Sequence, residues 1–170
     1  MKVKKLVLLA LLTAIALTIF MIEAQIPAPV PVPGVKLGLA NIVTMLAIYT
    51  LNPRQGFAIL VVRCVLGSVF GGGISGLAMS LTGGILAFWT MTLVRKLPVF
   101  SVYGVSILGA AAHNVGQVLA ASILMGSVYT FYYLPFLLLT GLVTGMVTGT
   151  ISSFTFRALR AANRNANTSD

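Results

Sequence analysis

Apolar residues dominate this chain in long runs, which are separated by short stretches rich in Gly, Pro and polar residues. A helix needs about 20 mostly apolar residues to cross the hydrocarbon core of a bilayer, with some latitude for tilt. The pattern predicts six membrane-spanning helices, of which the second and third are short. Their predicted ranges are 5–24, 36–51, 55–70, 76–94, 101–125 and 132–158. We therefore expect a single transmembrane domain over residues 1–158 and a polar cytoplasmic tail over residues 159–170.

The composition agrees with this pattern. Of the 170 residues, 58% are hydrophobic and 8% are charged, and the only acidic residues are Glu23 and Asp170. A soluble domain carries about 25% charged residues, because its surface faces water. The predicted fold class is therefore an all-α integral membrane protein.

The basic residues gather on one side of the predicted topology. The first span is preceded by three lysines, the 2–3 and 4–5 turns hold three basic residues, and three arginines follow the sixth span. These nine residues are Lys2, Lys4, Lys5, Arg54, Arg95, Lys96, Arg157, Arg160 and Arg164. Positively charged loops stay in the cytoplasm, so both termini are predicted to be cytoplasmic. This topology accounts for the net charge of +9, and we expect no nucleic-acid partner.

The N-terminal segment has the basic start and apolar centre of a signal peptide. Its apolar stretch from Leu6 to Ile22 exceeds the roughly 7–15 residues of a typical signal core, so we expect a retained helix rather than a cleaved one. Within it, Ala10 and Ala14 are spaced so that another helix can approach closely. The alternative is ordinary packing within the bundle.

The stretch GGGISGLA, which begins at Gly71, resembles a phosphate-binding loop at first sight. However, no lysine follows it, as a P-loop requires, and it lies between the third and fourth spans on the outer side. We interpret it as a tight turn in which glycine supplies a positive φ. The alternative is that its backbone amides line a ligand pocket.

Polar residues inside the spans are the candidates for function, since burying them in hydrocarbon is costly unless they are paired or face water. Arg63 lies near the middle of the third span and keeps its charge at any ordinary pH. Two partners are open for it, an anionic ligand or Glu23. His113 and Gln117 share one face of the fifth helix, with Asn114 beside them, and they line a cavity or bond between helices.

A proline-rich stretch joins the first two spans and is expected to be stiff and extended. Beyond it, Lys36 and Asn41 are predicted in the first turns of the second helix, whose N-terminal amides favour anions. The stretch is therefore either an ordered lid over an anion site or a plain linker. No cluster of metal ligands, cofactor motif or catalytic constellation is evident.

Three sequence stretches, PGVKLGLANIVTMLAIY, PRQGF…RCVLGSVFGGG and HNVGQ, resemble a family of bacterial membrane proteins. Its members are described as Gx transporters or as component I of heptaprenyl diphosphate synthase. The resemblance implies the six-helix fold of the S-components of energy-coupling factor (ECF) transporters, in the inner membrane of a bacterium. It also implies that Ala10 and Ala14 contact a coupling subunit that works with ATPases, and that the 1–2 loop covers the pocket.

These observations predict a membrane subunit that binds a small, largely apolar anion, for which the family resemblance suggests a quinone or isoprenoid precursor. The predicted substrate-binding residues are Lys36, Asn41, Arg63, His113, Asn114 and Gln117. The alternative is a non-catalytic membrane subunit of heptaprenyl diphosphate synthase. We expect no enzymatic activity, because prenyl elongation holds Mg²⁺ and diphosphate with clusters of aspartates, which this chain lacks.

Overall fold

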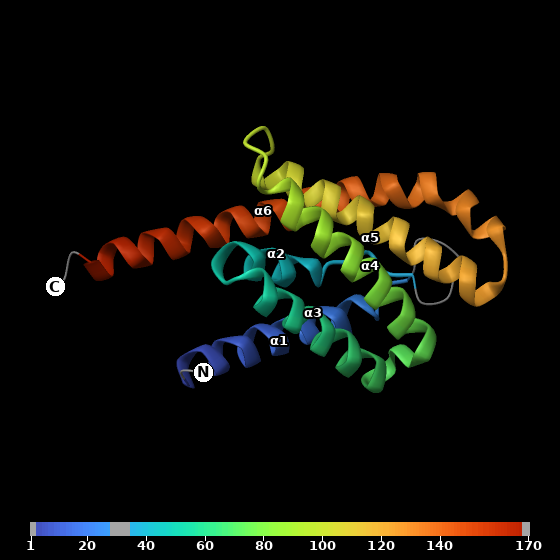
Figure 1. Ribbon diagram of the computed structural model, residues 1–170, viewed down its shortest axis with the longest axis horizontal. Coiled ribbons are helices and arrows are strands. Elements are labelled where there is room, and N and C mark those ends of the chain that lie inside the picture. The colour runs from blue at the N-terminus through green and yellow to red at the C-terminus, as the bar shows by residue number, and fades with distance from the viewer. Residues whose placement is uncertain (1–2, 28–34, 168–170) are drawn as a thin grey trace.

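The computed structural model describes residues 3–27 and 35–167, and this part of the chain is a bundle of helices (Figure 1). The elements in chain order are α1 (Val3–Glu23), α2 (Asn41–Thr50), α3 (Pro53–Gly67), the π-helical turn η1 (Ser68–Gly72), α4 (Gly73–Val94), α5 (Val102–Met125), the 3-10 turn η2 (Val128–Tyr133) and α6 (Leu134–Asn167). The predicted all-α class is confirmed.

Five helical stretches in the described part are long and apolar enough to cross a membrane, and the protein is therefore a multi-pass membrane protein. These stretches are Val3–Glu23, Pro53–Gly71, Gly73–Val94, Val102–Met125 and Val128–Ala162. The second predicted span is the exception. Its helix, α2, has 10 residues and a length of about 15 Å, half the thickness of a hydrocarbon core.

The prediction of a helix over 36–51 was wrong at its start. Residues 35–40 are not helical, and we call them the strap. Gly38 in the strap has a φ of 83°, in the left-handed region that glycine tolerates and a helix excludes. Lys36 is therefore not in a first helical turn, whereas Asn41 is the first residue of α2.

The chain runs back and forth between two ends of the bundle (Figure 1). Both described ends of the chain, the α2–α3 turn and the α4–α5 turn lie toward one end. The glycine turn and η2 lie at the other. α2 is in the middle, in contact with α1, α3, α4, α5 and α6. The strap and α2 thus bring the second predicted span into the centre of the bundle.

Local sequence signals explain several helix ends. Asn52 caps α3 by accepting a hydrogen bond from Gln55 N at 3.1 Å, and Pro53 occupies the first helical position. At the glycine run, Gly71 and Gly73 have φ values of 150° and 60°. The predicted glycine-dependent turn is confirmed, in the form of a short π-helical bend between α3 and α4.

Glycines also let the last three helices approach closely. A Cβ on Gly116 of α5 would lie 2.7 Å from Gly83 Cα of α4, and a Cβ on Gly145 of α6 would lie 2.6 Å from Ile107 Cα of α5. Such contacts are too short for any larger residue, and small residues are the usual means of close helix packing in membranes. Gly141, Gly145 and Gly149 form a glycine stripe along α6, and each lies against residues of α5.

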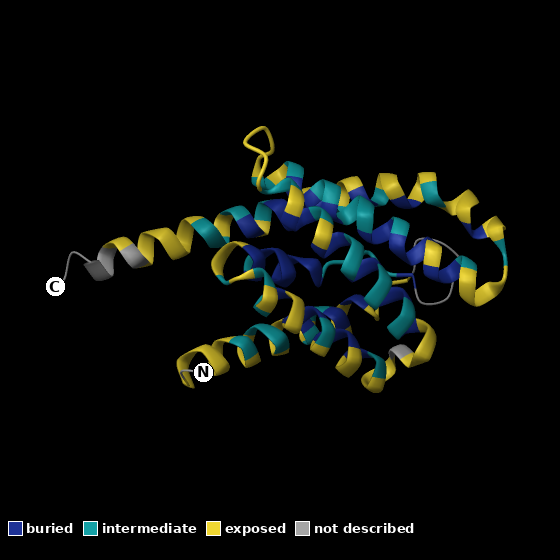
Figure 2. Ribbon diagram, viewed as in Figure 1, coloured by how far each residue is buried: buried dark blue, intermediate teal, exposed yellow. Residues whose placement is uncertain are grey.

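The polar tail predicted at 159–170 begins as a continuation of α6, which stays helical as far as Asn167. After Gly149 the sequence has neither glycine nor proline, and its alanine, leucine and arginine residues favour a helix, so nothing stops α6 at residue 158. The end of α6 projects from the bundle (Figure 1), and its described residues beyond Phe156 are exposed (Figure 2).

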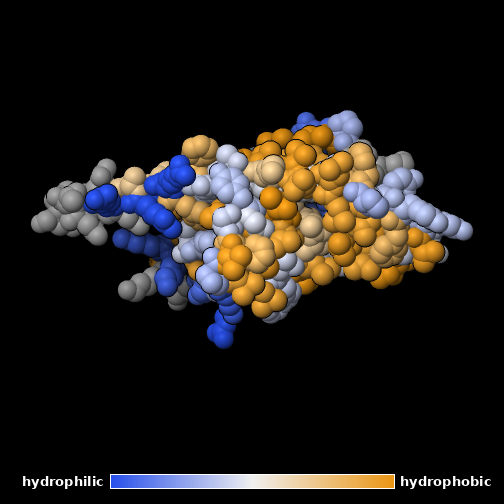
Figure 3. All heavy atoms as spheres, turned by 90° about the horizontal axis from the view of Figure 1, so that it is seen from above, coloured by the Kyte–Doolittle hydropathy of each residue, from blue (hydrophilic) through white to orange (hydrophobic). Residues whose placement is uncertain are grey.

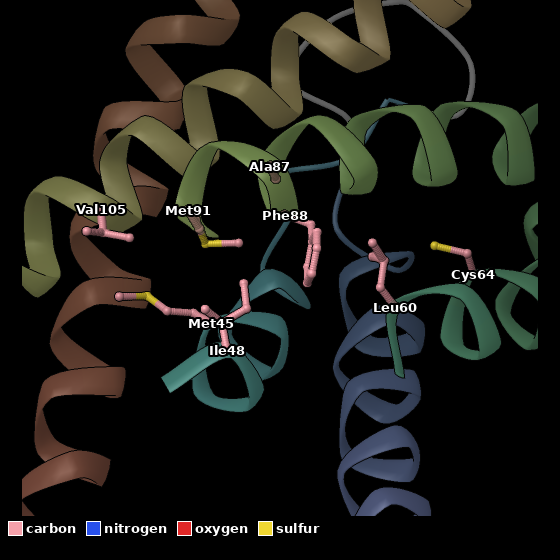
Figure 4. Packing of buried hydrophobic residues seen from close by; sticks show 8 residues of the cluster. All are labelled: Met45, Ile48, Leu60, Cys64, Ala87, Phe88, Met91 and Val105. Carbon is pink, nitrogen blue, oxygen red and sulfur yellow. The ribbon is translucent and has the colours of Figure 1, made fainter. Parts of the chain in front are cut away.

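Buried apolar side chains from four helices meet around α2. Met45 and Ile48 of α2 pack with Leu60 of α3, Met91 of α4 and Val105 of α5 in one cluster (Figure 4). The outer surface is apolar around its middle, and strongly hydrophilic side chains lie mostly toward the end with the termini (Figure 3). Packing in this apolar cluster holds α2 next to the buried polar groups that are described in the following subsection.

Candidate functional site

Two of the three predicted polar residues of α5, His113 and Gln117, form one side of a buried cluster. His113 is 2% exposed and Gln117 is fully buried. Gln117 Oε1 accepts a hydrogen bond from Lys36 N in the strap at 3.1 Å. The amide nitrogen of Gln117 lies 2.8 Å from His113 Nε2. Because an amide nitrogen only donates, His113 Nε2 accepts, which places the proton of a neutral imidazole on Nδ1.

The remaining ring nitrogen of His113 faces α4. A Cβ on Gly83 would lie 2.8 Å from His113 Nδ1, so only a glycine leaves room for the ring here. His113 Nδ1 makes no hydrogen bond of good geometry to the Gly83 backbone or to another described residue. The imidazole is therefore held on one edge by Gln117, and its other edge faces the Gly83 backbone.

Glu23 closes the opposite side of the cluster. Its carboxylate, 3% exposed, accepts a hydrogen bond from Gly38 N at 2.5 Å. Gly38 lies three residues before Asn41, the first residue of α2. The Glu23 carboxylate is therefore near the N-terminus of α2, which carries a partial positive charge. The strap is thus fixed by a side chain from α1 and a side chain from α5.

The structure corrects the expectation that the amides at the start of α2 are open to a ligand. The N–H groups of Asn41, Ile42 and Val43 donate to the carbonyls of Gly38, Leu39 and Ala40. Together with Glu23, these internal bonds occupy the position that was predicted for an anion. These three amides are therefore not free to bind a ligand.

Arg63 is a buried charged residue with unsatisfied hydrogen-bond donors. It is 3% exposed, and its Nε and Nη2 atoms make no hydrogen bond. Glu23, Lys36 and His113 are close enough to interact with it electrostatically. Among the described residues, however, no carboxylate forms an ion pair with Arg63, because Glu23 is engaged by the strap. The Arg63 charge is thus near one carboxylate without pairing with it.

Lys36 brings a second positive charge to the same place. Its Nζ lies 3.3 Å from the centre of the Phe20 ring, where the cation meets the negative face of the aromatic ring. Its side chain is partly buried and lies near both Glu23 and Arg63. Two cations and one carboxylate leave the cluster with an excess of positive charge when His113 is neutral.

Asn41 lines a small cavity beneath the strap. Both amide atoms of Asn41 are buried without a hydrogen-bond partner. The cavity has a volume of about 10 Å³, room for about one water molecule. Its lining comes from the strap, α2, α4, α5 and α6: Gly38, Asn41, Met45, Met91, Ser106, Ala110, Thr144 and Thr148.

Asn114 does not join the other predicted residues. Its Nδ2 donates to Leu137 O of α6 at 2.5 Å, so it links α5 to α6 on another side of the helix from His113. The amide oxygen of Asn114 has no partner. The sequence left two roles open for Asn114, cavity lining or a hydrogen bond between helices. The structure shows the hydrogen bond between helices.

The sequence interpretation missed the hydroxyl groups of the cavity. Ser106 Oγ and Thr148 Oγ1 lie 2.6 Å apart and connect α5 with α6. Thr144 and Thr148 are one turn apart within the glycine stripe of α6. The spacing of these two threonines puts their hydroxyl groups on one face of the helix, close to the packing glycines. This pattern in the sequence could have indicated that the hydroxyl groups point into the bundle.

Ala10 and Ala14 face away from the bundle. Both are exposed, whereas Ala16 and Phe20 on the other face of α1 are buried. The alternative that this alanine pair packs inside the bundle is therefore wrong. The remaining predicted feature, the lid, falls mostly on residues 28–34, which lie outside the described residues.

Residues 12–155 match the model of a protein family described as heptaprenyl diphosphate synthase component I. Because the match covers most of the chain, the chain belongs to this family, and the predicted resemblance is confirmed. The relation to S-components rests on the resemblance alone and stays a prediction. No curated protein and no solved structure was found to match.

Proposed function

We propose that this member of the heptaprenyl diphosphate synthase component I family is a non-catalytic membrane component of prenyl diphosphate synthesis, in the inner membrane of a bacterium. It binds an anionic ligand in the buried cluster between the strap, α3 and α5. The catalytic subunit is a separate protein. The ligand class that fits both the cluster and the family name is a diphosphate.

The observation that carries this proposal is the buried guanidinium of Arg63. An arginine remains charged when buried, and an unpaired charge in a protein interior costs several kcal/mol. Together with Lys36 and Glu23, Arg63 leaves the cluster with an excess of one positive charge. An anion bound in the cluster would be attracted by this charge. Lys36 lies beside Arg63 for a second contact.

The remaining residues would position the ligand. Asn41 offers an amide with no other partner, and His113 offers the N–H on Nδ1. Because the cavity beside Asn41 holds about one water molecule, a larger ligand requires movement of the strap. The two hydrogen bonds that fix the strap, to Glu23 and Gln117, are the contacts that such movement would break.

The family name refers to a synthase, and the composition of this chain supports a partner as the carrier of the chemistry. Prenyl transfer needs Mg²⁺ held by several carboxylate oxygens. The whole chain has two acidic residues, and the described residues contain no group of three metal-binding side chains. A partner must supply the aspartate clusters.

A second candidate is the substrate-binding subunit of a transporter that is driven by partner ATPases. The position of the cluster favours it. The cluster lies beneath the strap, toward the end of the bundle opposite the basic residues, which is the outer end under the positive-inside rule. Ala10 and Ala14 are exposed and so are free to contact a coupling subunit.

Two measurements on gently solubilised, tagged protein test these functions. Copurification of a soluble prenyl diphosphate synthase subunit supports the first candidate, and copurification of ATPase subunits supports the second. Thermal unfolding with heptaprenyl diphosphate or inorganic diphosphate tests the anion site. We expect stabilisation of the wild type and none of Arg63→Gln; equal responses of the two proteins would contradict the site.

A further inference from the structure

A second hollow lies between α3 and α4, away from the buried cluster. It has a volume of about 300 Å³, and we call it the aromatic groove. Its lining residues are Pro53, Arg54, Phe57, Phe88, Trp89 and Thr92. α3 begins and α4 ends toward the end of the bundle that carries the chain termini (Figure 1), so the groove is at the cytoplasmic end under the predicted topology.

The walls of the groove are aromatic and open to the surroundings. The Phe57 and Phe88 ring centres are 5.4 Å apart, and those of Phe88 and Trp89 are 5.8 Å apart, both in edge-to-face arrangements. Phe88 is buried, whereas Trp89 is 56% exposed and Phe57 37% exposed. Since these helices cross the membrane, the exposed rings face lipid, and a hydrocarbon chain fits against them.

The mouth of the groove is positively charged. Arg54 is exposed and forms no hydrogen bond or ion pair with a described residue. It lies in the first turn of α3, a 15-residue helix with no acidic residue in that turn, so the partial positive charge of the helix start adds to that of the guanidinium. Glu23, the only acidic residue in the described part of the chain, lies at the far end of α1.

Thr92 gives the groove a second polar group. It is 6% exposed, and its hydroxyl has no hydrogen-bond partner, unlike that of Thr150, which donates to the carbonyl of Met146 one turn earlier. The Thr92 hydroxyl is buried beneath the apolar lining, so Arg54 is the polar group that a ligand in the groove can reach. The groove thus combines an apolar wall with a cationic edge.

We propose that the aromatic groove binds an anionic phospholipid of the cytoplasmic leaflet. The phosphate contacts Arg54 at the start of α3, and an acyl chain lies against Phe57 and Trp89. A basic residue at the membrane surface attracts anionic lipid by about 1 kcal/mol, which corresponds to about a five-fold preference over a zwitterionic lipid. This inference does not depend on the proposed function.

The chain provides its own reporter for the test, since Trp89 is its only tryptophan. Purified protein is placed in vesicles of zwitterionic phosphatidylcholine that contain an increasing fraction of phosphatidylglycerol. In one series the phosphatidylglycerol carries bromine on the acyl carbons near the headgroup. In the matched series, brominated phosphatidylcholine takes its place at the same fraction. Bromine quenches tryptophan fluorescence at short range, so the two series compare occupancy of the groove by the two lipids.

We expect brominated phosphatidylglycerol to quench Trp89 at about a five-fold lower fraction than brominated phosphatidylcholine does. Arg54→Gln should remove this preference, and Arg54→Lys should keep most of it. Arg157→Gln is the matched control, because it removes one exposed positive charge on α6, outside the groove. Equal quenching by the two lipids in the wild type overturns the proposal. A preference that survives Arg54→Gln also overturns it, since the attraction then comes from the basic surface as a whole.

Discussion

The central residue of the cluster is Arg63. From the sequence, either a ligand or Glu23 was open as its partner. In the structure the Glu23 carboxylate binds Gly38 N, and Arg63 is close to it without forming an ion pair. Glu23 therefore stabilises the strap, while its charge only partly offsets those of Arg63 and Lys36. The Glu23 carboxylate thus stabilises the strap and also lowers the net positive charge around Arg63. The two alternatives drawn from the sequence, a ligand or Glu23 as the partner of Arg63, did not include this arrangement.

The first prediction concerns Arg63→Gln. Removing an unpartnered buried charge should leave the unfolding temperature of the ligand-free protein level or raise it. The same change should weaken diphosphate binding by on the order of 2–5 kcal/mol, the range for a desolvated charge contact. Thermal unfolding in detergent across a diphosphate titration measures both effects. A strongly destabilised ligand-free variant would mean that Arg63 is structural.

Glu23→Gln provides the matched comparison for this first prediction. It should destabilise the ligand-free protein by about 1–3 kcal/mol, because the strap loses a charge-assisted hydrogen bond. In the double variant, loss of the Arg63 charge should recover part of that cost, since the two residues interact. Strict additivity of the two changes would show that their charges are not coupled.

At the scale of single residues, the sequence predicted which polar side chains are buried better than it predicted their contacts. His113, Gln117, Arg63 and Lys36 do come together, because a polar group in an apolar helix must face the interior. Asn114 has the same polarity, but it is one position along the helix, about 100° away, and meets α6 instead. The hydrogen-bond partner of a buried polar side chain thus depends on which helix packs against its face, and the sequence pattern of one helix does not contain that information.

At the scale of elements, the strap and α2 show where the hydrophobic pattern was insufficient. The run from residue 36 to residue 51 is apolar enough to suggest one continuous helix. A single left-handed glycine, Gly38, shortens that helix, and side chains 15 and 79 positions away from it, Glu23 and Gln117, hold the resulting strap. The hydrophobic periodicity of a segment indicates which face is apolar. In the strap, however, long-range hydrogen bonds to Glu23 and Gln117 determine the backbone conformation.

The second prediction compares two left-handed glycines. A Cβ on Gly38 would lie 2.7 Å from His113 Cδ2, whereas a Cβ on Gly126, with φ of 60°, would meet no atom within 4 Å. Gly126→Ala should cost about 1–2 kcal/mol for backbone strain alone. Gly38→Ala should cost more, because the strap or the imidazole must also move. Thermal unfolding of both variants measures the difference, and equal costs would show that the strap is not packed on His113.

The third prediction concerns the exposed face of α1. Replacing Ala10 or Ala14 with Leu or Trp should reduce copurification of a partner subunit, because bulk on this face prevents close helix approach. Unfolding temperature and diphosphate binding should stay unchanged, since both alanines are exposed. Ala16→Leu is the control: Ala16 is 1% exposed, so this change should destabilise the bundle itself. Unchanged copurification in both Trp variants would rule out this face as the contact.

At the scale of the whole molecule, charge and fold agree. Of the basic residues that the sequence placed on one side, those in the described part of the chain belong to turns and ends at one end of the bundle (Figure 1). The Arg54 and Arg95 positions flank α2 there, and the Arg95 guanidinium donates to Ile48 O at the end of α2. A short second helix therefore does not alter the direction in which later helices run, because the strap and α2 together complete the return of the chain.

The last prediction tests this topology with two turns at opposite ends of the bundle. Val99 follows α4 and is 86% exposed, and Val128 follows α5 and is 73% exposed. Each is replaced by cysteine in a Cys64→Ala background, because Cys64 is the only cysteine of the chain. On intact cells, a maleimide that does not cross membranes should label Val128→Cys and leave Val99→Cys unlabelled until the cells are opened. That result follows from the eight described basic residues at the end that holds Val99, which the positive-inside rule places in the cytoplasm. Labelling in the reverse order would put the strap and the Arg63 cluster at the cytoplasmic end, and the aromatic groove would then face the outer leaflet.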